Sequence, residues 1–409
     1  MASERELCRT HSSSPLATLL VAVDPWSEPW GGQITFSRHL LRAFGRRLAV
    51  ASTCIADLPE GIWVDRRFEN VSIRYFNLGH LAPPNGKRPL IPARVSVYWM
   101  ARRYMKTVFE TAPRNILLDD PELLFPACRL PWESVCYCFP SVNNPVANSR
   151  YTFLRWLGSA FEHRMMNALD SIRPSAIIAA ADEAAIAGLK SRCGPPINTS
   201  VIHSFPTRVD TTLFYPEPRQ AARRTLGLPL DIPVLVVVGR LCWIKGWSFL
   251  LDVLSSLRDS LPAVRLEFVG DGEDRMALVA KTRALALADR VHITGFVPQS
   301  RLRAYINAAD LCLVGSFREG WSLAMLEALA CGQRIVSTDV SGAAAMIQNG
   351  RNGFIVRRDV GRFADAVISA MKLRDYAALS LETVRQFSLE TLEQDLGAIW
   401  PPLAGRQTS

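Results

Sequence analysis

Two glutamates eight positions apart, Glu319 and Glu327, are the residues best suited to chemistry. Glu319 stands on a glycine-containing turn, and Glu327 lies in the apolar, helix-like stretch that follows it. Such a turn exposes backbone N–H groups at a helix N-terminus, where an anion binds favourably. A carboxylate among Leu and Ala side chains needs a hydrogen-bond partner. We therefore expect Glu319 to hold sugar hydroxyls and Glu327 to bind a ribose diol, the alternative being two ordinary helix-surface glutamates.

Two cations, five positions apart, follow the end of an apolar run. Arg240 comes directly after Gly239, at the tip of the run Val234–Val238, and Lys245 precedes Gly246. The carboxyl edge of a parallel sheet is where such folds present ligands. An Arg fork and a Lys point charge can stabilise the charge that grows on a departing diphosphate. Two solvated surface cations are the alternative interpretation.

No convincing metal motif accompanies these residues. Asp271 sits on a turn, Gly270-Asp271-Gly272-Glu273, without a D-x-D pattern, and the nine cysteines include no C-x-x-C. Scattered cysteines suit a reducing cytosol. We therefore expect no metal and no other cofactor, and a cytoplasmic location.

The elements that must position these residues alternate between strand-like and helix-like patterns. In the first half, strand-like runs cover 16–23, 48–52, 71–76, 115–118, 134–138, 176–180 and 200–203. In the second half they cover 234–238, 265–269, 291–293, 311–314, 335–337 and 354–356, with helical stretches between them. This pattern predicts an α/β fold with two tandem Rossmann-like domains, mostly parallel sheets and a cleft between them.

A proline-rich stretch at 215–233, around a short basic helix, marks the expected domain junction. We expect a flexible tail at 1–14, an acceptor-binding domain at 15–214 and a nucleotide-sugar-binding domain at 234–386. Residues 387–409 are expected to form a last helix.

The segment from Val238 to about Ala370 resembles the donor-binding domain of the retaining glycosyltransferases of family 4 (group 1), which have the GT-B fold. The matching motifs, in order, are Gly-Arg…Lys-Gly at 239–246, Val269-Gly270-Asp271-Gly272, Gly295-Phe296-Val297, the Glu-x7-Glu segment, and Asn349-Gly350…Asn352-Gly353. In the first half, Gly31-Gly32 resembles the first-loop glycine pair of this family, although a simple turn is the alternative. The last helix resembles the one that crosses back to the first domain.

The resemblance implies that Arg240 and Lys245 grip the diphosphate of the donor and that Glu319 lies beside the transferred sugar. It also implies further donor contacts: ribose binding by Glu327, base contacts from the backbone of Phe296 and Val297, amides at Gly320, Trp321, Ser322 and Leu323, and close backbone approach at Gly31, Gly32 and Gly239.

Two positions depart from the family pattern. Many members carry a His on a strand end of the first domain, whereas the similar segment here, 136–141, has Cys138 as its nearest residue. A later Gly-Gly-x-x-Glu appears as Ser341-Gly342-Ala343-Ala344-Ala345, without the carboxylate. For the first departure three alternatives stay open: another residue serves in place of the His, the enzyme tolerates its loss, or activity is reduced. We expect the second departure to alter donor selection modestly.

Charge is uneven along the chain. Residues 1–224 carry 27 Lys/Arg against 19 Asp/Glu, whereas residues 225–409 carry 20 against 19. The stretches 94–106 and 151–166 mix aromatic, Met and cationic residues, which is typical of segments on anionic lipid. A core stripe beside a solvated basic face is an equally good interpretation. We expect peripheral contact with the inner face of a membrane and no nucleic-acid partner.

Together these features predict a retaining, metal-independent glycosyltransferase. It would move a hexose, with mannose as one candidate, from a UDP- or GDP-sugar to a saccharide or polyprenyl-diphosphate-linked acceptor in surface or exopolysaccharide assembly. A catalytically weak GT-B scaffold is the main alternative, because the His position is empty. A nicotinamide dehydrogenase would need G-x-G-x-x-G after the first strand, where the sequence has Gly31-Gly32 only.

Overall fold

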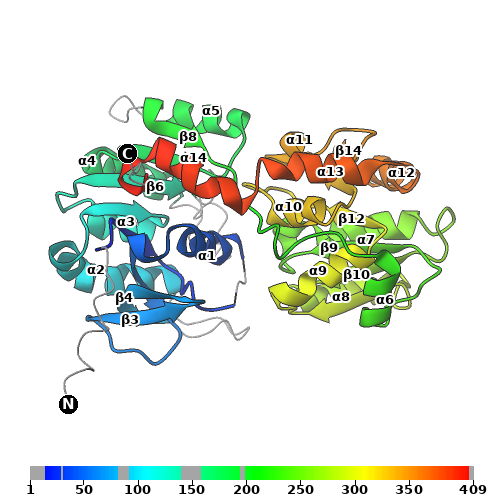
Figure 1. The fold of residues 1–409 in the computed structure, drawn as a ribbon. Coiled ribbons are helices and arrows are strands. Elements are labelled where there is room, and N and C mark those ends of the chain that lie inside the picture. The colour runs from blue at the N-terminus through cyan, green and yellow to red at the C-terminus, as the bar shows by residue number, and fades with distance from the viewer. Residues whose placement is uncertain (1–13, 29–30, 82–91, 140–157, 194–198, 405–409) are drawn as a thin grey trace, which may run out of the picture.

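The chain forms two α/β lobes, each built on one sheet (Figure 1). The computed structural model describes residues 14–28, 31–81, 92–139, 158–193 and 199–404. Expectations for the tail at 1–14 and for residues 151–157 therefore fall almost wholly outside the described residues.

The first lobe has an eight-stranded sheet in the order β3-β4-β2-β1-β5-β6-β7-β8. Its strands are β1 Ala17–Val21, β2 Leu48–Cys54, β3 Trp63–Phe68, β4 Val71–His80, β5 Asn115–Leu118, β6 Ser134–Phe139, β7 Ala176–Ala179 and β8 Ile202–Ser204. All neighbours pair in parallel except β3 and β4, which form an antiparallel hairpin at the edge. Helices α1 Gly32–Phe44, α2 Ala93–Thr111, α3 Pro121–Ala127, α4 Gly158–Ile172 and α5 Glu183–Arg192 join these strands.

The second lobe has a six-stranded, fully parallel sheet in the order β11-β10-β9-β12-β13-β14. Its strands are β9 Val234–Val238, β10 Arg265–Val269, β11 Val291–Gly295, β12 Leu311–Val314, β13 Ile335–Thr338 and β14 Gly353–Val356. The helices are α6 Arg219–Leu226, α7 Trp247–Ser256, α8 Arg275–Ala284, α9 Gln299–Ala308, α10 Leu323–Ala330, α11 Ala343–Met346, α12 Val360–Met371 and α13 Tyr376–Arg385. The expected tandem α/β architecture with mostly parallel sheets is confirmed.

Two elements were not predicted. Strand β3 carries Asp65, Arg66 and Arg67, so its apolar pattern is broken, as is typical of a solvent-facing edge strand. Helix α13 packs on α10 but buries only a few residues. Because it buries so few, its sequence has little of the apolar periodicity that predicts a helix.

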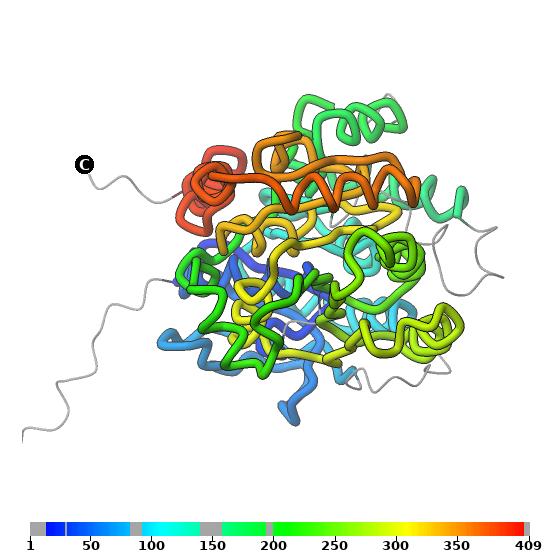
Figure 2. Tube along the Cα trace, turned by 90° about the vertical axis from the view of Figure 1, so that its right-hand side faces the viewer, coloured from blue at the N-terminus to red at the C-terminus, as the bar shows by residue number. Residues whose placement is uncertain are grey.

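The last helix, α14 Leu392–Ile399, returns to the first lobe, as expected (Figure 1). Leu392, Leu396 and Trp400 are fully buried in a core cluster of that lobe, and the Trp400 indole N–H donates to Ser134 Oγ at 2.8 Å. Figure 1 shows α14 on the upper side of the first lobe and α13 on the upper side of the second, and in Figure 2 these orange and red segments lie in the upper half of the molecule. No helix in the described ranges is both long and apolar enough to cross a membrane.

Candidate functional site

Each sheet reverses its strand order at one point, and the loops that follow the strands at both points carry charged residues. In the second sheet this point lies between β9 and β12, which are followed by Gly239–Lys245 and Gly315–Ser322. A pocket here is lined by residues of both loops, among them Gly239, Arg240, Lys245, Glu319 and Ser322. The pocket thus brings together five of the residues singled out in the sequence.

Lys245 and Glu319 form the central ion pair of this pocket. The Lys245 ammonium donates to both carboxylate oxygens of Glu319, at 2.7 and 2.9 Å, and Ser316 Oγ donates to Oε1 at 2.6 Å. Burial lowers the pKa of Lys245, but the Glu319 carboxylate more than offsets this, so the pKa is raised. Lys245 is therefore a fixed cation at the end of β9.

Arg240 lies at the rim of the same pocket. Its Nε donates to Glu273 Oε2 at 2.9 Å, and about half of its side chain is exposed. An exposed guanidinium can reorient with little cost, so Arg240 is free to follow an anion that enters the pocket.

Helix α10 begins at the edge of this pocket. Ser322, its N-cap residue, is buried and its side chain makes no capping hydrogen bond, so backbone N–H groups of the first turn keep their capacity for an anion. A Cβ added to Gly32 would lie 3.6 Å from Leu323 Cδ1, so the start of α1 faces the start of α10 across the two lobes. Gly31 borders open space.

The Trp321 side chain does not line the pocket and packs instead against Gly342 and Phe387. The indole ring packs where a Cβ on Gly342 would stand, at 2.8 Å, and lies 5.4 Å from the Phe387 ring. Gly342 has φ +80°, which a residue with a side chain would adopt only at a cost. The sequence predicts that the backbone amides of Gly320 and Trp321, not the indole ring, contact the donor, and this stays a prediction.

Glu327 is buried one helical turn below the start of α10. Burial raises its pKa to about 8, although a hydrogen bond from the Gln299 side chain and the charge of Lys245 both favour the ionised form. Gln299, the first residue of α9, was not anticipated as the partner. Phe296 and Val297 precede α9, so the expected ribose and base positions lie side by side at this end of the sheet.

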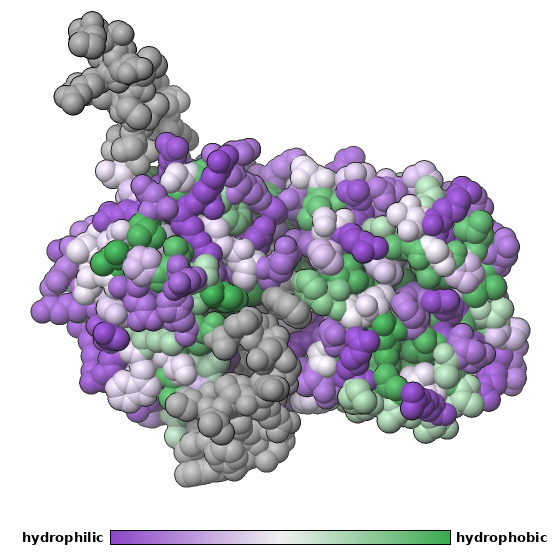
Figure 3. Space-filling model, turned by 90° about the horizontal axis from the view of Figure 1, so that it is seen from below, coloured by the Kyte–Doolittle hydropathy of each residue, from purple (hydrophilic) through white to green (hydrophobic). Residues whose placement is uncertain are grey.

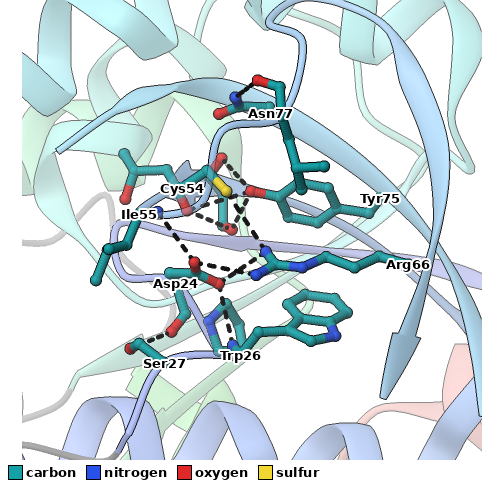
Figure 4. Close-up of polar contacts among 12 residues, drawn as sticks. Asp24, Trp26, Ser27, Cys54, Ile55, Arg66, Tyr75 and Asn77 are labelled. Carbon is teal, nitrogen blue, oxygen red and sulfur yellow. Dashed lines mark hydrogen bonds and ion pairs between the residues drawn. The ribbon is translucent and has the colours of Figure 1, made fainter.

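The loop after β1 is held by a buried ion pair (Figure 4). Asp24 receives two bonds from Arg66, at 2.9 and 3.3 Å, and backbone N–H groups of Trp26 and Ile55. The Arg66 guanidinium lies 4.4 Å above the Trp26 ring and 5.0 Å from that of Tyr75. Strand β3 therefore fixes the loop that leads to Gly31 and Gly32, a role that sequence patterns did not reveal.

A direct link between the lobes involves one of the departures from the family pattern. Asp182, at the start of α5, accepts a hydrogen bond from the Gly342 N–H at 3.1 Å, and its own N–H donates to Ser341 Oγ at 3.1 Å. The same carboxylate caps α5 through Ala185 N. The segment 341–345 thus contacts the first lobe rather than presenting a carboxylate.

The geometry defines a two-lobed α/β protein whose second lobe has a pocket lined by Arg240, Lys245 and Glu319 at its sheet switch point. Residues 232–372 match the family model described as "Glycosyl transferases group 1". The second lobe therefore matches this family model over most of its length.

Named relatives are similar to this chain over part of its length. The D-inositol 3-phosphate glycosyltransferase of Mycobacterium leprae is 37% identical over 172 residues, which cover 40% of this chain and 39% of that protein. One from Catenulispora acidiphila is 33% identical over 193 residues, covering 44% and 45%. The chain spans less than half the length of these curated relatives.

Solved structures extend the likeness to both lobes. Sucrose-phosphate synthase from Thermosynechococcus elongatus superposes with a TM-score of 0.77 at 20% identity, over 95% of this chain and 98% of that one. HepE from Anabaena in complex with UDP-glucose gives 0.67 at 18% identity, over 93% and 98%. WaaG, a glycosyltransferase of lipopolysaccharide biosynthesis, gives 0.65 at 17% identity, over 94% and 99%. The fold is GT-B.

Proposed function

We propose that this chain is a retaining, metal-independent glycosyltransferase that moves a hexose from a UDP- or GDP-sugar to a saccharide acceptor. The observation that carries the proposal is the Lys245–Glu319 pair at the start of α10, with Arg240 at the rim. A cation held by a carboxylate can pass its hydrogen bonds to a diphosphate, while the carboxylate turns to sugar hydroxyls.

The donor would lie mainly on the second lobe. Arg240, Lys245 and the α10 amides would stabilise the diphosphate as the glycosidic bond breaks, and Glu327 would bind the ribose. The HepE structures contain UDP and UDP-glucose, which favours UDP among the candidate nucleotides. The sugar would leave and be replaced on the same face, with water excluded as the lobes close on the acceptor.

Replacing Lys245 or Arg240 by Ala tests this assignment. Loss of one charge contact to the leaving group should cost roughly 2–4 kcal/mol of transition-state stabilisation, which is a 30- to 1,000-fold fall in kcat. Lys281→Ala is the matched control, because Lys281 pairs with Asp252 and does not line the pocket. Turnover within a few-fold of the parent in both site variants would refute the assignment. Unchanged turnover after exhaustive dialysis against EDTA would support metal independence.

A GT-B scaffold without turnover is the second candidate, and one observation favours it. Cys138 is the residue nearest to the position where the family resemblance leads us to expect a His, and burial raises the pKa of its thiol well above the usual range. A neutral thiol cannot replace an imidazole. A melting-temperature screen with UDP-, GDP- and ADP-sugars, followed by a donor hydrolysis assay, separates the candidates. Stabilisation without hydrolysis or transfer would identify the scaffold.

We also propose contact with an anionic membrane surface through α2, and hence a cytoplasmic, peripheral location. Trp99 and Val95 on this helix are 61% and 44% exposed, and the Arg102 guanidinium lies 5.9 Å from the Trp99 ring. Seen from below, the first lobe shows hydrophobic patches among hydrophilic ones (Figure 3). A polyprenyl-diphosphate-linked acceptor and surface-polysaccharide assembly would fit this location.

Vesicle sedimentation tests the membrane proposal. Binding to vesicles with 30% anionic lipid should weaken with salt and fall in a Trp99→Ala variant, whereas Met276→Ala, which changes a side chain that is 77% exposed on the second lobe, should bind like the wild type. Equal binding to neutral vesicles, or none at low salt, would refute it.

A further inference from the structure

Carboxyl groups gather where the first sheet reverses its strand order, outside the donor pocket described above. Asp119 and Asp120 directly follow β5, and Glu122 is the second residue of α3; they are 1%, 6% and 6% exposed. Glu122 has a partner, because Arg94 donates to it at 2.7 Å. Asp120 Oδ2 accepts hydrogen bonds from the Ala22 N–H at 3.2 Å and from Gln33 Nε2 at 2.6 Å.

Two buried polar atoms beside this cluster lack a hydrogen-bond partner within the described part of the chain. One is Asp119 Oδ1 and the other is the hydroxyl of Tyr137, a residue that is fully buried in strand β6. Burial raises the pKa of Tyr137, and the charges of Asp120 and Glu122 add to the effect, which places the phenol close to these carboxyls. Native proteins rarely leave such groups unsatisfied, so both atoms call for a bound polar molecule.

The pair of aspartates has the chemistry of a hydroxyl-binding site. Burial, and then the charge of Asp120, raise the pKa of Asp119 well above its usual range. A carboxyl and a carboxylate side by side can donate one hydrogen bond and accept another. A sugar hydroxyl needs both, whereas a phosphate would be repelled.

The position of the pair links it to the cleft. Gln33, which bonds to Asp120, is the neighbour of Gly32, and Gly32 faces Leu323 at the start of α10. Leu118 pairs with Tyr137 across β5 and β6, so Asp119 stands beside Cys138. The pair therefore lies on the first-lobe wall, next to the place where the expected His is missing.

We propose that Asp119 and Asp120, together with the Tyr137 hydroxyl, bind a hydroxyl group of a sugar in the cleft and so serve in place of the absent His. Asp120 accepts from the hydroxyl, and Asp119 positions and complements it. This inference rests on the proposed function. The hydroxyl belongs either to the transferred sugar of the donor or to the acceptor, and the experiment distinguishes these sources.

The test compares full-length wild type with Asp119→Ala, Asp120→Ala and Tyr137→Phe. Glu122→Gln is the matched control, because Glu122 is equally buried but already paired. The affinity for UDP and for UDP-glucose is measured by calorimetry, with GDP and GDP-mannose in parallel, followed by donor hydrolysis and by transfer to a panel of neutral saccharides. Asp119→Asn is the milder variant if Asp119→Ala lowers the melting temperature by more than about 5 °C.

We expect every variant to bind the free nucleotide within twofold of wild type, since the nucleotide lies on the other lobe. If the hydroxyl is the donor's, the aspartate variants lose the extra affinity for the nucleotide sugar, and hydrolysis falls about tenfold or more. If it is the acceptor's, both are unchanged and transfer alone falls about tenfold, while Glu122→Gln stays within twofold throughout.

Aspartate variants that match an active wild type in nucleotide-sugar binding, hydrolysis and transfer would overturn this inference and leave the proposed function intact. A uniform loss of nucleotide affinity would show a merely structural role and also overturn it. Wild type that binds no nucleotide sugar would instead refute the proposed function itself.

Discussion

Replacing Glu327 by Gln should stabilise the ligand-free protein and weaken nucleotide binding. The carboxyl is 7% exposed, and burial raises its pKa from 4.5 to about 8. Between these two values the folded state holds a proton that the unfolded state has released. The unfolding free energy of the wild type therefore falls as pH rises through this window, and the stability lost reaches its limit near pH 8.

The magnitude follows from the size of the pKa shift. Each pH unit inside the window costs roughly 1.4 kcal/mol, so two units, from pH 5.5 to 7.5, cost about 2–3 kcal/mol. Gln has no proton to release, and its amide oxygen can still accept the hydrogen bond from Gln299. The difference in stability between Glu327→Gln and wild type should therefore grow by this amount across the two pH values.

Urea unfolding of both proteins at pH 5.5 and 7.5 measures this difference, because contributions from all other groups cancel between them. Calorimetry with UDP gives the second readout. An ionised Glu327 that accepts two ribose hydroxyls should release up to one proton on binding at pH 7, visible as a dependence on the buffer's ionisation heat. Loss of charge-assisted bonds in the variant should weaken UDP about 10- to 100-fold.

The two readouts fail independently. A stability difference that stays constant with pH would show that Glu327 does not titrate in this window, and the burial argument would be wrong. An unchanged affinity for UDP, with the pH dependence present, would remove Glu327 from the ribose site. Only the joint result supports a buried carboxyl kept for ligand binding at the expense of stability.

Three further substitutions probe the framework around the site. Arg66→Met leaves Asp24 buried without its cation and should lower the unfolding free energy by roughly 3–5 kcal/mol in urea unfolding; a loss below about 1 kcal/mol would show that the pair does not hold the loop. Gly246→Ala would place a Cβ 1.8 Å from a backbone oxygen at φ +72° and should lower unfolding free energy by more than about 2 kcal/mol, whereas Gly227→Ala, at φ +65° with open space, should cost about 1 kcal/mol. Asp182→Ala removes an interlobe contact and a helix cap and should cost about 1–2 kcal/mol, with a larger radius of gyration by X-ray scattering; an unchanged radius would deny it a role in closure.

Much of the second lobe could be predicted because its signals are local. Strand β9 and helix α10 are apolar runs with clear ends, and the cations and glutamates stand directly beside them. Glu327 needs a partner among its apolar neighbours, as the sequence predicts, and a hydrogen bond from Gln299 provides one. Which residue would provide it depends on how α9 packs beside α10, and nothing in either helix encodes that choice locally.

Contacts between distant segments could not be predicted either, because they too depend on packing that no local sequence pattern encodes. The Asp24–Arg66 pair joins a loop to an edge strand 42 positions away, and the bond between Asp182 and Gly342 spans 160 positions. Polar residues at such sites look like ordinary surface residues until the lobes are packed. The pair Asp119–Asp120 likewise reads as a solvated turn after a strand, and only its burial reveals the unusual chemistry.

The two departures from the family pattern, at Cys138 and at 341–345, each lie beside polar contacts that the structure shows. At 341–345 the missing carboxylate coincides with a hydrogen-bonded contact to Asp182, so the segment is tied to the opposite lobe. Beside Cys138 the missing imidazole coincides with a buried pair of carboxyls that can make the same kind of hydrogen bonds to a sugar. If Asp119 and Asp120, after β5, bind the sugar hydroxyl that a His at the end of β6 would bind, the loss of the His does not by itself imply loss of activity. The same carboxyls should make this wall of the cleft favour uncharged sugars over phosphorylated ones.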